Sequence, residues 1–141
     1  MKATLLYRIA AVLFILFAAG HTIGFLTFRP ASQEGLAVWE SMNKVHFQVG
    51  NGSFTYAGFY LGFGLFQTLF LLFFAYLAWH LGSLASKNPA AIGALGWVFC
   101  ATQVVSLVLS WMYFLVPPVV LSALLTICLG WAAWLVSAAR R

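Results

Sequence analysis

Four long runs of apolar residues dominate this sequence and limit what the chain can fold into. They cover residues 5–28, 54–84, 90–115 and 119–139, and none of them contains an ionised side chain after Arg8. A helix needs about 20 apolar residues to cross the hydrocarbon core of a membrane. Strands of a membrane β-barrel are shorter, about 10 residues of alternating character. The runs therefore predict four membrane-spanning helices.

The composition supports the same conclusion. Of the 141 residues, 64% are hydrophobic and only 6% are charged. A soluble domain carries about 25% charged residues, so this chain has too few to cover a globule. That excludes a soluble or disordered protein, and it excludes a nucleic-acid binder although the formal net charge is +5. We predict an all-α polytopic membrane protein, a four-transmembrane-helix bundle in which residues 1–141 form a single domain.

The basic residues predict the orientation of the chain. With four spans, both termini and the loop between the second and third spans lie on the same side of the membrane. That side carries five of the seven basic residues: Lys2, Arg8, Lys87, Arg140 and Arg141. The other side carries only Arg29 and Lys44. Because cytoplasmic loops are enriched in Lys and Arg, we expect both termini to be cytoplasmic.

The segment 29–53, on the predicted outer side, contains a short amphipathic helix. Ser32 is a suitable N-cap, and Glu40 and Lys44 form an i,i+4 pair in the favourable order. Its apolar stripe recurs every three residues, at Leu36, Trp39, Met42 and Val45. Such a helix lies on the membrane surface or folds over the end of the bundle. Residues 50–52, Gly-Asn-Gly, predict a turn before the second span.

Small and polar residues line one face of the third span and one face of the fourth. At alternating spacings of three and four, the third-span stripe is Gly93, Gly96, Cys100, Gln103, Leu107 and Ser110. The fourth-span stripe is Ala123, Thr126, Gly130, Ala133 and Ser137. Membrane helices associate through close packing of small residues and through interhelical hydrogen bonds. We therefore predict that these two helices form a tight hairpin.

The polar residues within the spans fall into two tiers. Because a helix rises about 1.5 Å per residue, the depth of each residue in the membrane can be estimated. Four residues lie at a similar depth near the outer ends of their spans: His21, Tyr60, Ser110 and Ser122. Nearer the midplane lie Gln67, Gln103 and Thr126. A polar group in hydrocarbon must find a partner within the protein. We therefore expect both tiers to lie in the interior of the bundle and to cluster there.

Several kinds of chemistry are disfavoured because the residues they need are missing. The chain has no Asp, and its two acidic residues, Glu34 and Glu40, lie in the outer segment. Proton-coupled transporters usually carry a carboxylate inside a span, and glycoside hydrolysis needs a pair of carboxylates. Cys100 and Cys128 lack the C-x-x-C spacing of a redox dithiol. We interpret them as reduced packing residues.

The three histidines are the remaining candidates for chemistry. His80 lies near the cytoplasmic end of the second span, where an interfacial histidine is ordinary. His21 and His46 share the outer side with Glu40, and such ligands suit zinc or iron, while two histidines also suit haem. No metal-binding spacing supports such a site, so we predict no metal and assign no cofactor. The simplest interpretation of His21 is a hydrogen bond to a neighbouring helix.

Four segments of the chain carry a resemblance to a known group of proteins. They are HTIGF at 21–25, FRP at 28–30, MNKVHF at 42–47 and GFYLGFGLF at 58–66. On these motifs, residues 5–85 resemble an uncharacterised family of small four-helix bacterial integral membrane proteins. The resemblance implies a four-helix fold in the bacterial inner membrane but no catalytic residues. A similarity to DoxX-like proteins is architectural only and implies no function.

These residues leave three functional hypotheses open. The first is a binding or accessory protein that holds a hydrophobic or amphiphilic small molecule, a lipid or a quinone, in an outward-opening pocket within the bundle. Its predicted ligand-binding residues are the two polar tiers together with His46 and Glu40. The second is a membrane enzyme acting on a lipid, with His21 as acid/base and Tyr60, His46 or Glu40 as the second group. The third is a structural subunit of a larger membrane complex or of a homo-oligomer.

Overall fold

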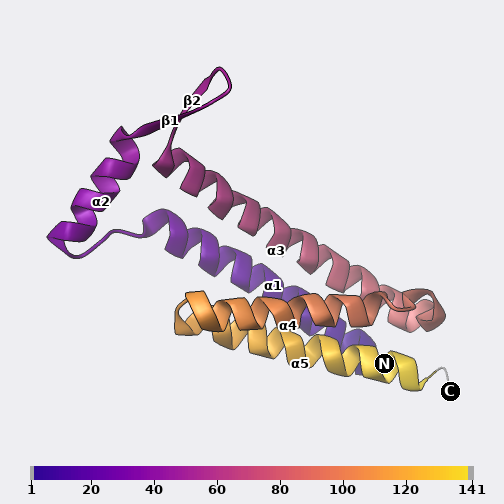
Figure 1. Cartoon of the computed structure of the whole chain (residues 1–141). Coiled ribbons are helices and arrows are strands. Elements are labelled where there is room, and N and C mark those ends of the chain that lie inside the picture. Colours follow the sequence, from indigo (N-terminus) through magenta and orange to yellow (C-terminus); the bar gives the residue numbers. More distant parts are fainter. Residues whose placement is uncertain (1, 140–141) are drawn as a thin grey trace. The chain divides into compact units, whose positions relative to one another are not determined.

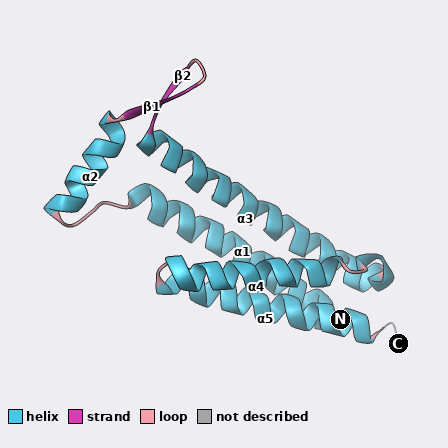
Figure 2. Cartoon of the chain, viewed as in Figure 1, coloured by secondary structure: helices cyan, strands magenta, loops and turns pink. Residues whose placement is uncertain are grey.

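Residues 2–139 are described by the computed structural model, and they are almost entirely helical (Figure 1, Figure 2). The helices are α1 (Lys2–Thr27), α2 (Gln33–Lys44), α3 (Tyr56–Lys87), the 3-10 turn η1 (Pro89–Ile92), α4 (Leu95–Tyr113) and α5 (Val116–Ala138). Within the described residues, α1, α3, α4 and α5 are each long and apolar enough to cross a membrane. The predicted all-α fold with four candidate spans is confirmed. Arg140 and Arg141, which entered the prediction of orientation, lie outside the described residues.

The described residues form two compact units. The first comprises the chain up to Phe17 together with the chain from Leu71 onward. The second comprises Ala18–Phe70. Helices α1 and α3 therefore each contribute a part to both units, whereas α4 and α5 belong to the first unit and α2 belongs to the second.

Helices α4 and α5 lie side by side and antiparallel in the first unit (Figure 1). A Cβ atom at Gly96 would lie 3.4 Å from Cβ of Ala133, and a Cβ atom at Gly130 would lie 3.3 Å from Sγ of Cys100. The helices approach this closely because both positions lack a side chain. The hairpin that the small residues predict is confirmed.

Aromatic rings fill much of the core of the first unit. Phe14 of α1 stacks on Phe99 of α4, with ring centroids 5.6 Å apart, and it packs against Phe74 of α3 at 5.7 Å. Tyr7 of α1 is fully buried, and a Cβ atom at Gly96 would lie only 2.7 Å from its hydroxyl oxygen. Helices α1, α3 and α4 therefore share one core in this unit.

Helix α2 of the second unit begins as the sequence predicts. The Ser32 side chain accepts a hydrogen bond from the backbone N–H of Gly35, at 3.0 Å. Trp39 packs edge-on against Phe28 and Tyr60, with ring centroids 6.4 and 6.3 Å apart. These contacts fold α2 against the neighbouring end of α3, which is one of the two placements that its amphipathic stripe allowed.

A short antiparallel hairpin, β1 (His46–Val49) and β2 (Gly52–Thr55), separates α2 from α3. The sequence analysis predicted only its turn, which is present with Gly50 at a φ of +58°, in the left-handed region that favours glycine. Phe47 and Phe54 are paired across the strands, and their ring centroids lie 6.1 Å apart. The hairpin is therefore an element that the prediction missed.

Helices α4 and α5 begin at different residues from those predicted. Helix α4 begins at Leu95, later than the predicted residue 90, because Pro89–Ile92 forms a 3-10 turn and Gly93 has a φ of +56°. Helix α5 begins at Val116, so its first turn includes the prolines at 117–118. Proline is tolerated there because the first N–H groups of a helix have no intrahelical partner. The break between the two helices therefore lies at residues 114–115, directly before the prolines.

Candidate functional site

His21 is half-buried and bonds to the backbone of a neighbouring helix. Its Nε2 atom lies 3.1 Å from the carbonyl oxygen of Gly64, and because a carbonyl only accepts, Nε2–H donates. Its ring stacks on Phe25, with centroids 5.7 Å apart, and the missing side chain at Gly64 makes room for the Phe25 ring. The interpretation of His21 as hydrogen-bonded to a neighbouring helix is confirmed, and the partner is a backbone carbonyl of α3. A role for Tyr60, His46 or Glu40 as a second group beside His21 stays a prediction.

Two threonines extend this contact between α1 and α3. The hydroxyl oxygens of Thr22 and Thr68 lie 2.8 Å apart. Thr22 donates to the carbonyl of Ala18 at 2.7 Å, so in the Thr22–Thr68 contact Thr68 is the donor. The carbonyl of Gly64, 3.3 Å from the Thr68 oxygen, is the alternative acceptor for that same hydrogen. With His21, the two threonines form a polar clamp between the helices of the second unit. Neither threonine was predicted, although a threonine next to an interior histidine was a usable signal.

Four of the predicted polar residues lie at or near the α4–α5 interface. The oxygens of Ser110 and Ser122 are buried and lie 3.4 Å apart. Gln103 is also buried, and Thr126 donates to the carbonyl of Ser122 at 2.8 Å. Gln67, by contrast, is exposed on α3, so the prediction of an interior position for it is wrong. A single cluster joining the polar residues of both units stays a prediction.

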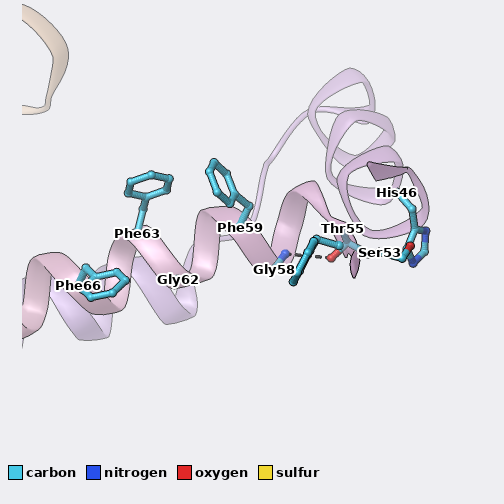
Figure 3. A pocket seen from close by; sticks show the side chains of 9 residues that line it. His46, Ser53, Thr55, Gly58, Phe59, Gly62, Phe63 and Phe66 are labelled. Carbon is cyan, nitrogen blue, oxygen red and sulfur yellow. Dashed lines mark hydrogen bonds between the residues drawn. The ribbon is translucent and has the colours of Figure 1, made fainter. Parts of the chain in front are cut away.

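A groove of about 510 Å³ runs along the first turns of α3 beside the β-hairpin (Figure 3). Its lining carries no Asp, Glu, Lys or Arg and consists of His46, Ser53, Phe54, Thr55, Gly58, Phe59, Gly62, Phe63 and Phe66. Figure 3 shows the rings of Phe59 and Phe63 on the same side of α3. A Cβ atom added to Gly62 would meet no atom within 4 Å. The groove is therefore apolar along the helix and polar at the hairpin end.

The polar end of the groove is built on the register of the two strands. His46 stands opposite Thr55, and its Nδ1 atom lies 2.9 Å from the carbonyl oxygen of Lys44. The Ser53 oxygen accepts a hydrogen bond from the side-chain amide of Gln48, at 3.2 Å. These bonds fix an imidazole and a hydroxyl group where the apolar part of the groove ends.

Of the residues predicted to bind a ligand, His46 alone lines this groove. Tyr60 is on the same helix but packs against Trp39. Glu40 is exposed and pairs with Lys44, whose Nζ atom lies 3.5 Å from its carboxylate. The sequence did not mark the phenylalanines of the groove as candidate ligand-binding residues, because a phenylalanine in an apolar span is expected to face lipid.

Among residues 2–139, no three His, Cys, Asp or Glu side chains are grouped so that they could hold a metal ion. Cys100 and Cys128 are both free thiols. No protein-family model, curated protein or solved structure matches the chain. The fold and the site define a helical membrane protein with a groove beside one of its spans.

Proposed function

We propose that this chain is a small membrane protein that binds a hydrophobic or amphiphilic small molecule, of the lipid or quinone class. The observation that carries this proposal is the groove, which is apolar along α3 and polar only at the β-hairpin. Ligand sites in proteins are typically concave, mostly apolar and about 300–1,000 Å³ in volume, with a few polar groups that fix orientation. At about 510 Å³ the groove has that size and that division of character.

The groove replaces the pocket near His21 as the proposed site within the second unit. The Nε2 atom of His21 is engaged with the carbonyl of Gly64, and the imidazole does not line the groove. An interhelical hydrogen bond gives the His21 side chain a structural role. Because Nε2 is engaged with that carbonyl, we favour a binding protein over a lipid-modifying enzyme in which His21 is the acid/base.

The proposed location is the bacterial inner membrane, with both termini cytoplasmic. It is supported by the five-to-two distribution of basic residues and by the positive-inside rule. In that orientation the β-hairpin and the first turns of α3 lie at the outer face. A ligand then enters the groove from the outer leaflet.

Native mass spectrometry of the full chain in a mild detergent tests the proposal. We expect the wild type to carry one co-purifying molecule of lipid size. Gly62→Leu fills the groove without a clash at Cβ, and we expect it to lose that molecule. Gly24→Leu is the matched control, because Gly24 is also a helical glycine with no atom within 4 Å of an added Cβ but lies outside the groove.

Two results would contradict the proposal. One is a molecule that stays bound in Gly62→Leu as well as in the control. The other is a stoichiometric protein partner, or a second copy of the chain, that Gly62→Leu releases while the wild type carries no small molecule. That second result would favour a structural subunit.

A further inference from the structure

The polar end of the groove discriminates between headgroups, and this inference rests on the proposed function. The lining includes no Asp, Glu, Lys or Arg. The nearest charged residue in sequence to His46 is Lys44, whose ammonium group is exposed and pairs with Glu40 at 3.5 Å. His46 and Ser53 are exposed, so a charged headgroup at this end would gain no opposite charge among the lining residues.

Three side chains at this end have hydrogen-bonding capacity left over. Because Nδ1 of His46 lies 2.9 Å from a carbonyl oxygen, Nδ1–H is the donor of that bond, and in the corresponding tautomer Nε2 is an acceptor. Ser53 accepts from Gln48 through its oxygen, so its own O–H is available to donate. Thr55 likewise accepts from the backbone N–H of Gly58 at 3.0 Å, so its O–H is also available to donate. The groove thus presents one acceptor and two hydroxyl donors at its polar end.

A hydroxyl group is the simplest partner for these groups, since it donates one hydrogen bond and accepts others. We propose that the groove selects an uncharged, hydroxyl-bearing lipid, whose hydroxyl donates to Nε2 of His46 and accepts from Ser53. Its chain lies along the helix over Gly62, beside the rings of Phe59 and Phe63. Monoacylglycerols, prenols and quinols share this chemistry.

The chain of the ligand follows the direction of α3. Gly58 and Gly62 are one helical turn apart, and at Gly62 no atom lies within 4 Å of an added Cβ. Phe59 and Phe63 stand beside the glycines (Figure 3) and contact each other, with ring centroids 4.7 Å apart. An extended chain along α3 would therefore lie over Gly62 and against these two rings.

The test compares three probes that share one chain, namely 1-monooleoylglycerol, methyl oleate and oleate, bound to the full chain in detergent and counted by native mass spectrometry. We expect 1-monooleoylglycerol to bind more tightly than methyl oleate, which lacks a donor, and more tightly than oleate, which is charged. His46→Phe removes the acceptor, so it lowers the affinity for 1-monooleoylglycerol by between about twofold and tenfold, as expected for one hydrogen bond. The control is His80→Phe, because His80 is exposed on α3 and outside the groove.

The outcomes separate this inference from the proposed function. If all three probes bind equally, or if His46→Phe and His80→Phe behave alike, the headgroup selection is refuted while the groove remains a lipid site. If Gly62→Leu also leaves the binding of every probe unchanged, the proposed function fails with it. A preference for oleate that His46→Phe abolishes would mean that the site takes an anion, and that too contradicts the inference. Prenyl alcohol and quinol probes then identify which hydroxyl-bearing lipid binds most tightly.

Discussion

Tyr7 is the residue whose replacement gives the sharpest test of how the helices pack. Its side chain is fully buried, and among the described residues its hydroxyl group has no hydrogen-bond partner. Burying an unpaired hydroxyl costs about 1–3 kcal/mol in proteins, whereas a void the size of the missing oxygen costs about 1 kcal/mol. Tyr7→Phe is therefore expected to leave the free energy of unfolding unchanged or to raise it by up to about 2 kcal/mol.

Gly96→Ala tests the contact between Tyr7 and Gly96 by a change at Gly96. The added Cβ would lie 2.7 Å from the Tyr7 hydroxyl oxygen, and the buried ring cannot swing away. Overpacking of this kind costs about 1–3 kcal/mol. In the Tyr7→Phe background this oxygen is absent, so we expect Gly96→Ala to destabilise that protein by at least about 1 kcal/mol less than it destabilises the wild type. This difference is the coupling free energy of a double-mutant cycle.

Unfolding of the four proteins by titration with a denaturing detergent, followed by circular dichroism, measures this cycle. Gly20→Ala is the control, because an added Cβ there meets no atom within 4 Å and the change is expected to be neutral or slightly stabilising. The reasoning is refuted if Tyr7→Phe lowers stability by more than about 1 kcal/mol, since the hydroxyl group would then have a partner. Equal costs of Gly96→Ala in both backgrounds would refute the predicted contact.

Three further predictions concern the clamp, the thiols and the topology. His21→Phe removes the hydrogen bond to Gly64 and should lower the free energy of unfolding by about 1 kcal/mol, measured by the same titration, without changing lipid binding. A loss of lipid binding at unchanged stability would contradict this prediction. Replacing both Cys100 and Cys128 by Ala should leave lipid binding unchanged, and a loss of binding in the folded double variant would revive a role for the thiols. Reporter fusions at the C-terminus should be active only with a cytoplasmic reporter, and a periplasmic signal would overturn the orientation.

The spans and the α4–α5 hairpin were predictable because their signals are local and strong. Runs of apolar residues set the spans, and the glycines at 96 and 130 mark where backbones can approach closely. The Ser32 cap was predictable for the same reason, since it depends on residues within one turn. The start of α5 at Val116 was less predictable, because proline both ends a helix and suits the first turn of the next one.

The groove was not predictable, because it depends on elements that the sequence does not visibly connect. The β1 strand is only four residues long, and its alternation of His, Phe, Gln and Val was the signal available for it. Without the hairpin, His46 stands alone in a loop and the first phenylalanines of α3 are indistinguishable from lipid-facing ones. The ligand site was predicted near His21 instead, because a polar residue inside a span suggests function. In the structure, a backbone carbonyl is the hydrogen-bond partner of His21.

Photo-crosslinking tests the central claim, lipid binding in the α3 groove, most directly. The probe is a 1-monoacylglycerol with a diazirine in its chain, irradiated with the full protein and mapped by peptide mass spectrometry. The account predicts crosslinks concentrated in residues 54–66, reduced by Gly62→Leu and unchanged by Gly24→Leu. Crosslinks spread evenly over the exposed apolar faces of α4 and α5 as well as α3, and insensitive to Gly62→Leu, would mean that the groove holds only the lipid that surrounds any membrane helix.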